Sequence, residues 1–117
     1  MPRYFVGALL ALIAVGSLLP GTLRIPSPFL TTTEHLLAYA FATFVIVATV
    51  NRTWLRILAV PSMAILACVF EMIQIIVPGR RGDWDDVVFG ICGVIIGGVL
   101  AGLWRASLWA WLRLRNR

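Results

Sequence analysis

The stretch FEMIQIIVPGRRGDWDDVVFG, residues 70–90, decides the fold, because one apolar segment ends in it and another begins. Pro78 and Gly79 interrupt the apolar pattern, which indicates a turn between two helices. Glu71 lies about two helical turns before Pro78, inside a run that otherwise has the composition of a membrane span. A charged group near the centre of a bilayer costs about 2.5–3.5 kcal/mol on insertion scales, so Glu71 must face protein or a water-filled cavity. The stretch predicts two membrane helices with a buried polar group close to their connection.

The composition of the whole chain predicts an integral membrane protein. Of its 117 residues, 61% are hydrophobic and 13% are charged, and every basic residue is an arginine. A soluble domain of this size could not cover so much apolar surface with so few charges. The net charge of +5 comes from arginines at segment ends, which is the pattern of topology signals, so we expect no nucleic-acid partner.

Four apolar segments are each near the roughly 20 residues that a helix needs to cross a bilayer. They cover residues 4–19, 34–50, 54–77 and 86–104, and a basic tail follows over residues 105–117. Such long continuous runs do not fit barrel strands. We predict an all-α protein whose single domain, residues 1–117, is a four-helix transmembrane bundle. A cleaved secretory signal is the alternative for the first segment, although no small-x-small cleavage site stands out.

The distribution of arginine predicts the orientation of the bundle. Seven arginines lie at the two termini and around the loop between the second and third segments, and three lie in the other two loops. The side richer in arginine faces the cytoplasm, so both termini are expected there and residues 78–86 outside.

The last segment carries signals for its start and for its packing. Asp83 is expected to cap the helix, and Asp85 and Asp86 would lie in its first turn, where the helix dipole favours negative charge. The sequences GVIIG (residues 93–97) and GVLAG (residues 98–102) are small-xxx-small motifs, which allow close approach of helix backbones in lipid. Packing within the bundle is favoured over a dimer.

Polar residues on three of the segments are spaced so that they share helix faces and end toward the same side of the membrane. On the last segment, Gly90, Gly93 and Gly97 share the face of Asp86 and would let another helix or a ligand approach. We therefore expect one outward-facing polar pocket. Its members would be His35, Tyr39, Glu71, Gln74, Arg80 and Asp86.

Most of these residues also have a purely structural interpretation. His35 could lie in water at the membrane interface, Tyr39 could serve packing, and Asp86 could act only in the first turn of its helix. Arg80 could belong to a solvated loop. Glu71 is different, because even a structural role requires a buried partner such as Arg80 or His35.

Two motifs together resemble the VanZ-like family of small bacterial membrane proteins, which is named for a teicoplanin-resistance accessory protein. The motifs are EHLLAYA (residues 34–40) and EMIQIIVPGRRGDWDDVVFGICG (residues 71–93), and the resemblance covers most of the chain from about Thr31 onward. The family pattern departs at Thr31 and Thr32, where an Asp-Lys pair is usual, and at Gly90, where Asn is usual. The resemblance implicates His35, Tyr39, Glu71, Gln74, Arg80, Asp86 and Gly93.

The resemblance implies a multi-pass protein of the bacterial cytoplasmic membrane, linked to the cell envelope and to antibiotic resistance through lower susceptibility to a lipophilic glycopeptide. It does not establish a reaction. The favoured function is non-enzymatic: the pocket would bind a lipid-linked or amphiphilic molecule. Arg80 would bind phosphate or carboxylate, and Glu71 and Asp86 would bind amines or hydroxyls.

Two alternatives stay open. The first is a membrane-embedded enzyme that acts on a lipid-linked glycan or a phospholipid through an acid–base pair of His35 and Glu71. A metal-assisted version would add Asp86, but the sequence lacks a compact ligand motif, so no metal or other cofactor is expected. The second alternative is structural, with the polar groups holding the bundle together and another membrane protein as the partner. Membrane lipids are expected partners in every case.

Overall fold

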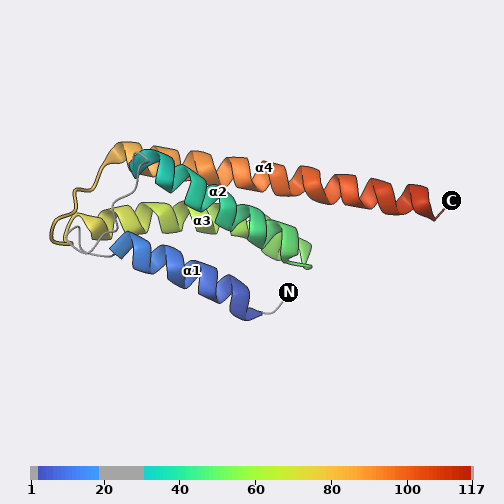
Figure 1. The fold of residues 1–117 in the computed structure, drawn as a ribbon, viewed down its shortest axis with the longest axis horizontal. Helices are drawn as coiled ribbons and strands as arrows, with labels where there is room; N and C mark the ends of the chain where they lie inside the picture. Colours follow the sequence, from blue (N-terminus) through green and yellow to red (C-terminus); the bar gives the residue numbers. More distant parts are fainter. Residues whose placement is uncertain (1–2, 19–30, 117) are drawn as a thin grey trace.

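The computed structural model describes residues 3–18 and 31–116. These residues form four helices and no strand (Figure 1), so the prediction of an all-α protein is confirmed. The helices are α1 (Arg3–Leu18), α2 (Thr31–Thr49), α3 (Thr53–Gln74) and α4 (Trp84–Arg115). The predicted loop between α1 and α2, which contains Arg24, lies outside the described residues.

Three of the helices are long and apolar enough to cross a membrane. The qualifying segments are Thr32–Thr49, Thr53–Gln74 and Trp84–Arg115. The apolar part of α1, Tyr4–Gly16, is shorter. At 1.5 Å per residue the whole of α1 spans about 24 Å, less than the roughly 30 Å of a hydrocarbon core. The described residues therefore contain three candidate spans, and a fourth span and the side on which the termini lie stay predictions.

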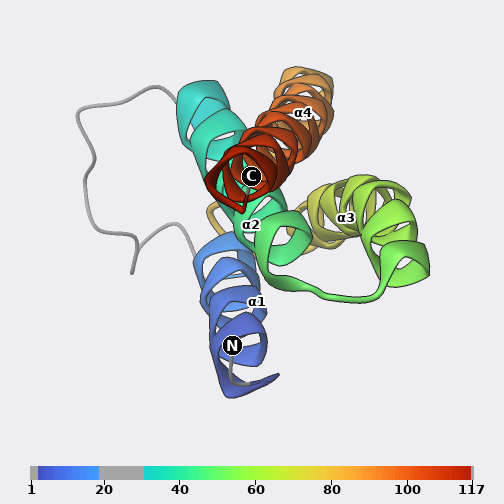
Figure 2. The same ribbon diagram turned by 90° about the vertical axis from the view of Figure 1, so that its right-hand side faces the viewer.

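Helices α2 and α4 form the most extensive interface of the bundle, and glycines on α4 are the reason. A Cβ atom added at Gly93 would overlap the backbone carbonyl of Leu36, and one added at Gly97 would overlap that of Ala40. Only a residue without a side chain lets the two backbones approach so closely, which is the usual way for helices to associate in lipid. Figure 2 shows α2 between α1 and α4, and α1 contacts α2 and α3.

The connection between α3 and α4 begins earlier than the sequence indicated. Helix α3 ends at Gln74, whereas the apolar pattern placed its end at Val77. Pro78 disfavours helical geometry in Val77, and Gly79 has a φ of 76°, a left-handed conformation that suits glycine. Glu71 consequently lies about one turn from the end of α3, and not two turns inside it.

Helix α4 begins where the sequence predicted and continues further. The carboxylate of Asp83, the N-cap residue, accepts a hydrogen bond from the backbone N–H of Asp85 at 3.1 Å, which confirms the predicted cap. The helix runs on for 32 residues, about 48 Å, so residues 105–115 of the predicted tail are its last turns. Figure 1 shows this end of α4 extending beyond the other helices. Arg113 lies over the ring of Trp109, with its Cζ 3.6 Å from the ring centroid.

Candidate functional site

Three helix ends meet at one end of the bundle and bring ionisable side chains together. At this end α2 begins, α3 ends and α4 begins (Figure 1). His35 lies just over one turn into α2, Glu71 in the last turn of α3, and Asp86 in the first turn of α4. Residues far apart in the sequence therefore become neighbours because their helices alternate in direction. We call these three residues the His–Glu–Asp cluster.

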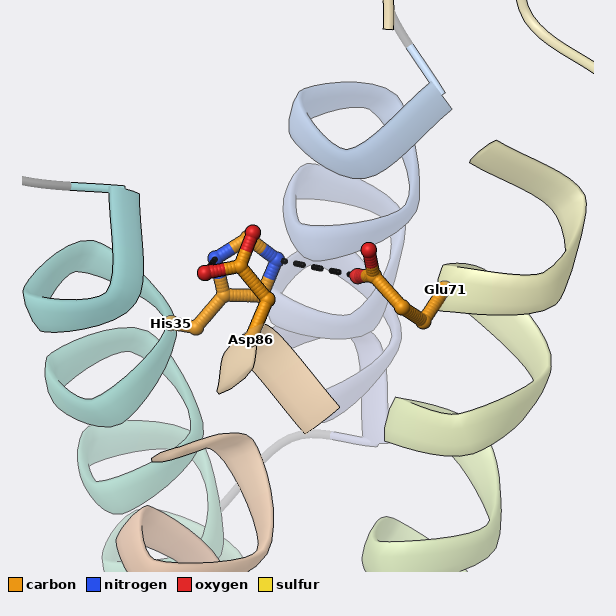
Figure 3. Close-up of side chains that lie close together, drawn as sticks. All are labelled: His35, Glu71 and Asp86. Carbon is orange, nitrogen blue, oxygen red and sulfur yellow. Dashed lines mark ion pairs between the residues drawn. The ribbon is translucent and has the colours of Figure 1, made fainter. Parts of the chain in front are cut away.

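The side chains of His35, Glu71 and Asp86 lie close together, and the dashed line in Figure 3 marks the contact between His35 and Glu71. His35 Nε2 is 3.7 Å from Glu71 Oε2, and His35 Nδ1 is 3.9 Å from Asp86 Oδ1. Both distances are too long for direct hydrogen bonds. One potential ligand atom from each residue lies within 4.8 Å of the other two. The three residues could therefore hold a metal ion together.

The carboxylates of the cluster are buried, which makes their surroundings energetically important. Glu71 is 4% exposed and Asp86 is 6% exposed. A buried carboxylate costs several kcal/mol unless hydrogen bonds or opposite charges compensate it. The side chain of His35 is more accessible, at 12%. The cluster is therefore largely buried, and His35 is its most accessible member.

A backbone hydrogen bond fixes the orientation of Glu71. Its Oε1 accepts the N–H of Asp83 at 2.7 Å, which leaves Oε2 toward His35. Asp83 is the N-cap of α4, and the backbone N–H of an N-cap is often satisfied by a glutamate at the third helical position. Here a glutamate from α3 supplies that acceptor. No local sequence pattern indicates this contact, because the acceptor comes from another helix.

Tyr39 and Gly90 lie next to the cluster, further into the bundle. The rings of His35 and Tyr39 are stacked, with centroids 6.4 Å apart and an interplanar angle of 26°. Tyr39 is almost fully buried. A Cβ atom added at Gly90 would lie 3.4 Å from both the Tyr39 ring and the Cβ of Ala67, which is ordinary contact. Gly90 therefore leaves little more than the volume of a methyl group beside this ring.

Gln74 carries a buried amide with unused hydrogen-bonding capacity. It follows Glu71 by three residues, so both lie on the same face of α3. Its side chain is 1% exposed, and its Nε2 makes no hydrogen bond within residues 3–18 and 31–116. A buried donor without an acceptor costs about 1–3 kcal/mol. Such a group is a candidate for contact with a bound molecule.

Arg80 is placed differently from the sequence-based expectation. Its Nη2 donates a hydrogen bond of 2.6 Å to the carbonyl oxygen of Gly16, near the C-terminus of α1. A cation is favourable there, because the last carbonyls of a helix carry negative partial charge. Within the described residues, the ion pair of Glu71 is with His35. Of the two partners that the sequence suggested for Glu71, His35 forms the ion pair, and Arg80 ties α1 to the α3–α4 connection.

A comparison with known protein families finds a match over most of the chain. The family model described as VanZ/LLP1 matches residues 3–105, a range that includes the whole His–Glu–Asp cluster. No curated protein and no solved structure matches the chain. Three helices capable of spanning a membrane and the extent of the family match together indicate a membrane protein. The chain belongs to the VanZ/LLP1 family.

Proposed function

We propose that the protein binds an amphiphilic or lipid-linked molecule and holds the polar head group of that molecule at the His–Glu–Asp cluster. The observation that carries this proposal is the position of the cluster, which is buried yet lies at the end of the candidate spans. Head groups of membrane lipids lie at this depth. A mostly apolar site with a few convergent polar groups is the usual composition of a small-molecule site.

The surroundings of the cluster suit the apolar part of such a ligand. Several large hydrophobic side chains close to the cluster in the sequence are exposed on the outside of the bundle. They are Met72, Ile75, Ile76, Val88 and Phe89. A ligand whose head group reaches the cluster between α2, α3 and α4 would place its hydrocarbon chain along these side chains. In lipid, packing of the chain against these side chains, and not exclusion of water, would stabilise the contact.

The charges of the cluster select for particular head groups. Two carboxylates accept hydrogen bonds from amines and hydroxyls, and charge-assisted hydrogen bonds of this kind are about twice as strong as neutral ones. The amide of Gln74 adds a donor for a carbonyl or hydroxyl oxygen. An amino- or hydroxyl-bearing group, such as a sugar or an amino acid side chain of a lipophilic glycopeptide, matches this set.

The cluster would face outward. The opposite end of the bundle holds the start of α1, the α2–α3 loop and the end of α4, where most arginines are concentrated. Replacing Arg81 by cysteine in a chain without Cys68 and Cys92 tests this orientation. An impermeant thiol reagent should label intact cells, and labelling only after permeabilisation would place the cluster on the cytoplasmic side.

The proposed function is tested by teicoplanin susceptibility together with direct binding. Expression in a susceptible bacterium should raise the inhibitory concentration of teicoplanin, and Glu71→Gln and His35→Asn should abolish the effect at equal membrane abundance. Asp85→Asn is the matched control, because Asp85 is an exposed aspartate next to Asp86. Native mass spectrometry of the purified protein with added teicoplanin should show a complex that the two cluster variants lose. Wild-type protein that neither protects cells nor binds would refute the proposal.

One observation favours a second candidate, a membrane-embedded enzyme acting on a lipid-linked glycan or phospholipid. His35 and Glu71 are 3.7 Å apart, and the hydrogen bond from Asp83 orients the carboxylate, as is typical of an acid–base pair held by a third group. Proteoliposomes containing the protein and a labelled lipid-linked glycan distinguish the two functions. Binding without product formation supports the first, and turnover that Glu71→Gln abolishes supports the second.

A further inference from the structure

We propose that the His–Glu–Asp cluster binds a divalent transition-metal ion of the Zn²⁺ type, with one ring nitrogen of His35 and one oxygen from each of Glu71 and Asp86 as ligands. The proposal goes beyond the binding of an amphiphile, and it is tested with the metal ion alone. Failure of metal binding and failure of amphiphile binding are therefore separate results.

The chemistry of the three donors matches this class of ion. Imidazole nitrogen suits Zn²⁺, copper, iron and nickel, whereas carboxylate oxygen also suits magnesium, calcium and manganese. One nitrogen with two oxygens thus favours a transition ion over Mg²⁺ or Ca²⁺, which prefer oxygen alone. Each ionised carboxylate contributes one negative charge, and a divalent cation can neutralise both. In a site this buried, that neutralisation is a large favourable contribution.

The distances within the cluster are close to those around a bound ion. In a tetrahedral zinc site with bonds of about 2.0–2.1 Å, neighbouring ligand atoms lie about 3.3–3.4 Å apart. The two close contacts of His35 use different ring nitrogens, 3.7 Å from Nε2 to Glu71 and 3.9 Å from Nδ1 to Asp86. One ligand atom from each of the three residues lies within 4.8 Å of the other two. Contraction by about 0.5–1.5 Å is enough to close the site. Rotation of the side chains supplies this movement without displacing a helix.

The protein also supplies the support that a metal ligand requires. The ligands of metal sites are held in position by hydrogen bonds from outer groups, and loss of such a group typically lowers metal affinity 10–100-fold. The Asp83 N–H plays this role for Glu71 by binding Oε1 and directing Oε2 toward the cluster. The ring of Tyr39 stacks on the ring of His35 and limits its movement toward the interior of the bundle.

Three protein ligands leave one position of a tetrahedral ion open. Open sites of this type bind a water molecule or a ligand atom, whereas structural zinc sites use four protein ligands. Gln74, one turn from Glu71 with an unpaired and buried amide nitrogen, is close enough in the fold to belong to the same polar region. The ion would therefore be able to hold an anionic oxygen of a bound molecule as well as stabilise the cluster.

The test is metal binding by the purified protein in detergent, after treatment with a chelator and without a polyhistidine tag. Isothermal titration with ZnCl₂ should give one ion per chain. The background carries Cys68→Ala and Cys92→Ala, because a free thiol can also bind Zn²⁺. The Co²⁺ form should then show the visible absorption of a bound ion without thiolate charge-transfer bands.

The variants decide whether the cluster is the site. Glu71→Gln, Asp86→Asn and His35→Asn should each weaken Zn²⁺ binding by at least about 100-fold, more than the loss of an outer-shell group. Asp85→Asn should bind as the wild type does. Circular dichroism and thermal unfolding identify variants that fold, and two folded cluster variants are sufficient. Absence of stoichiometric binding in the wild type, or equal affinity in the cluster variants and Asp85→Asn, overturns the proposal.

Discussion

Gly93→Ala should separate α2 from α4 and thereby disturb the His–Glu–Asp cluster. The added Cβ overlaps the carbonyl of Leu36, a backbone atom that cannot rotate away, so one of the two helices must shift. Overpacking of this kind costs about 1–3 kcal/mol. Alanine also favours helix by up to about 1 kcal/mol relative to glycine. The net destabilisation of Gly93→Ala is therefore expected to be about 0–2 kcal/mol, and the control is needed to separate the two effects.

Gly102→Ala is that control. No atom lies within 4 Å of the position that its Cβ would take, so only the gain in helix propensity applies. This variant should be stabilised by up to about 1 kcal/mol. The difference between the two variants is then the overlap energy, about 1–3 kcal/mol. Unfolding in mixed micelles, followed by tryptophan fluorescence, measures both free energies. Equal values within about 0.5 kcal/mol would mean that α2 and α4 do not pack through Gly93.

Three further predictions follow from polar contacts at the helix ends. Arg80→Ala should lower stability by about 0.3–1 kcal/mol through its lost interaction with the end of α1, while Arg81→Ala should have no measurable effect; unfolding in micelles compares them. The effects of Arg80→Ala and Glu71→Gln should add within about 0.5 kcal/mol, and rescue of one by the other would show that the two residues are paired after all. Asp83→Ala should cost about 0.5–2 kcal/mol as a lost N-cap, with hydrogen exchange faster only in the first turn of α4. Arg105→Ala should accelerate exchange at the end of α2, because its Nη1 donates to the carbonyl of Ala48 at 2.8 Å; unchanged exchange there would contradict this role.

Composition and helical spacing predicted the all-helical fold because both are properties of short segments. The early end of α3 depends on Pro78, whose effect on Val77 is local but competes with an apolar pattern that continues to that residue. The apolar pattern predicts an end of the last helix near Trp104, whereas α4 continues to Arg115. Its apolar pattern weakens after Trp104, yet no Gly or Pro follows to end the helix, so it continues to Arg115.

The candidate site could be predicted only in part. His35, Glu71 and Asp86 come together because each lies near the end of a helix, and alternating helices bring these ends to one side of the bundle. The partner of Arg80 could not be predicted, since it is a backbone carbonyl of α1 and depends on where that helix packs. The hydrogen bond from the Asp83 N–H to Glu71 could not be predicted either, because every residue except proline has a backbone N–H and the sequence does not show which one is used.

Glu71 connects the stability of the bundle to the chemistry of the cluster, because its two oxygens have different partners. Oε1 completes the hydrogen bonding at the start of α4, and Oε2 faces His35. Removal of the side chain would lose both contacts, so the effect of Glu71→Ala on function could not be separated from misplacement of α4. Glutamine keeps a neutral acceptor for the Asp83 N–H and removes the charge that a cation or an amine requires. A folded Glu71→Gln protein that no longer binds therefore assigns the loss to the negative charge and the second acceptor oxygen of the carboxylate, and this assignment holds whether the bound group is a metal ion or the head of an amphiphile.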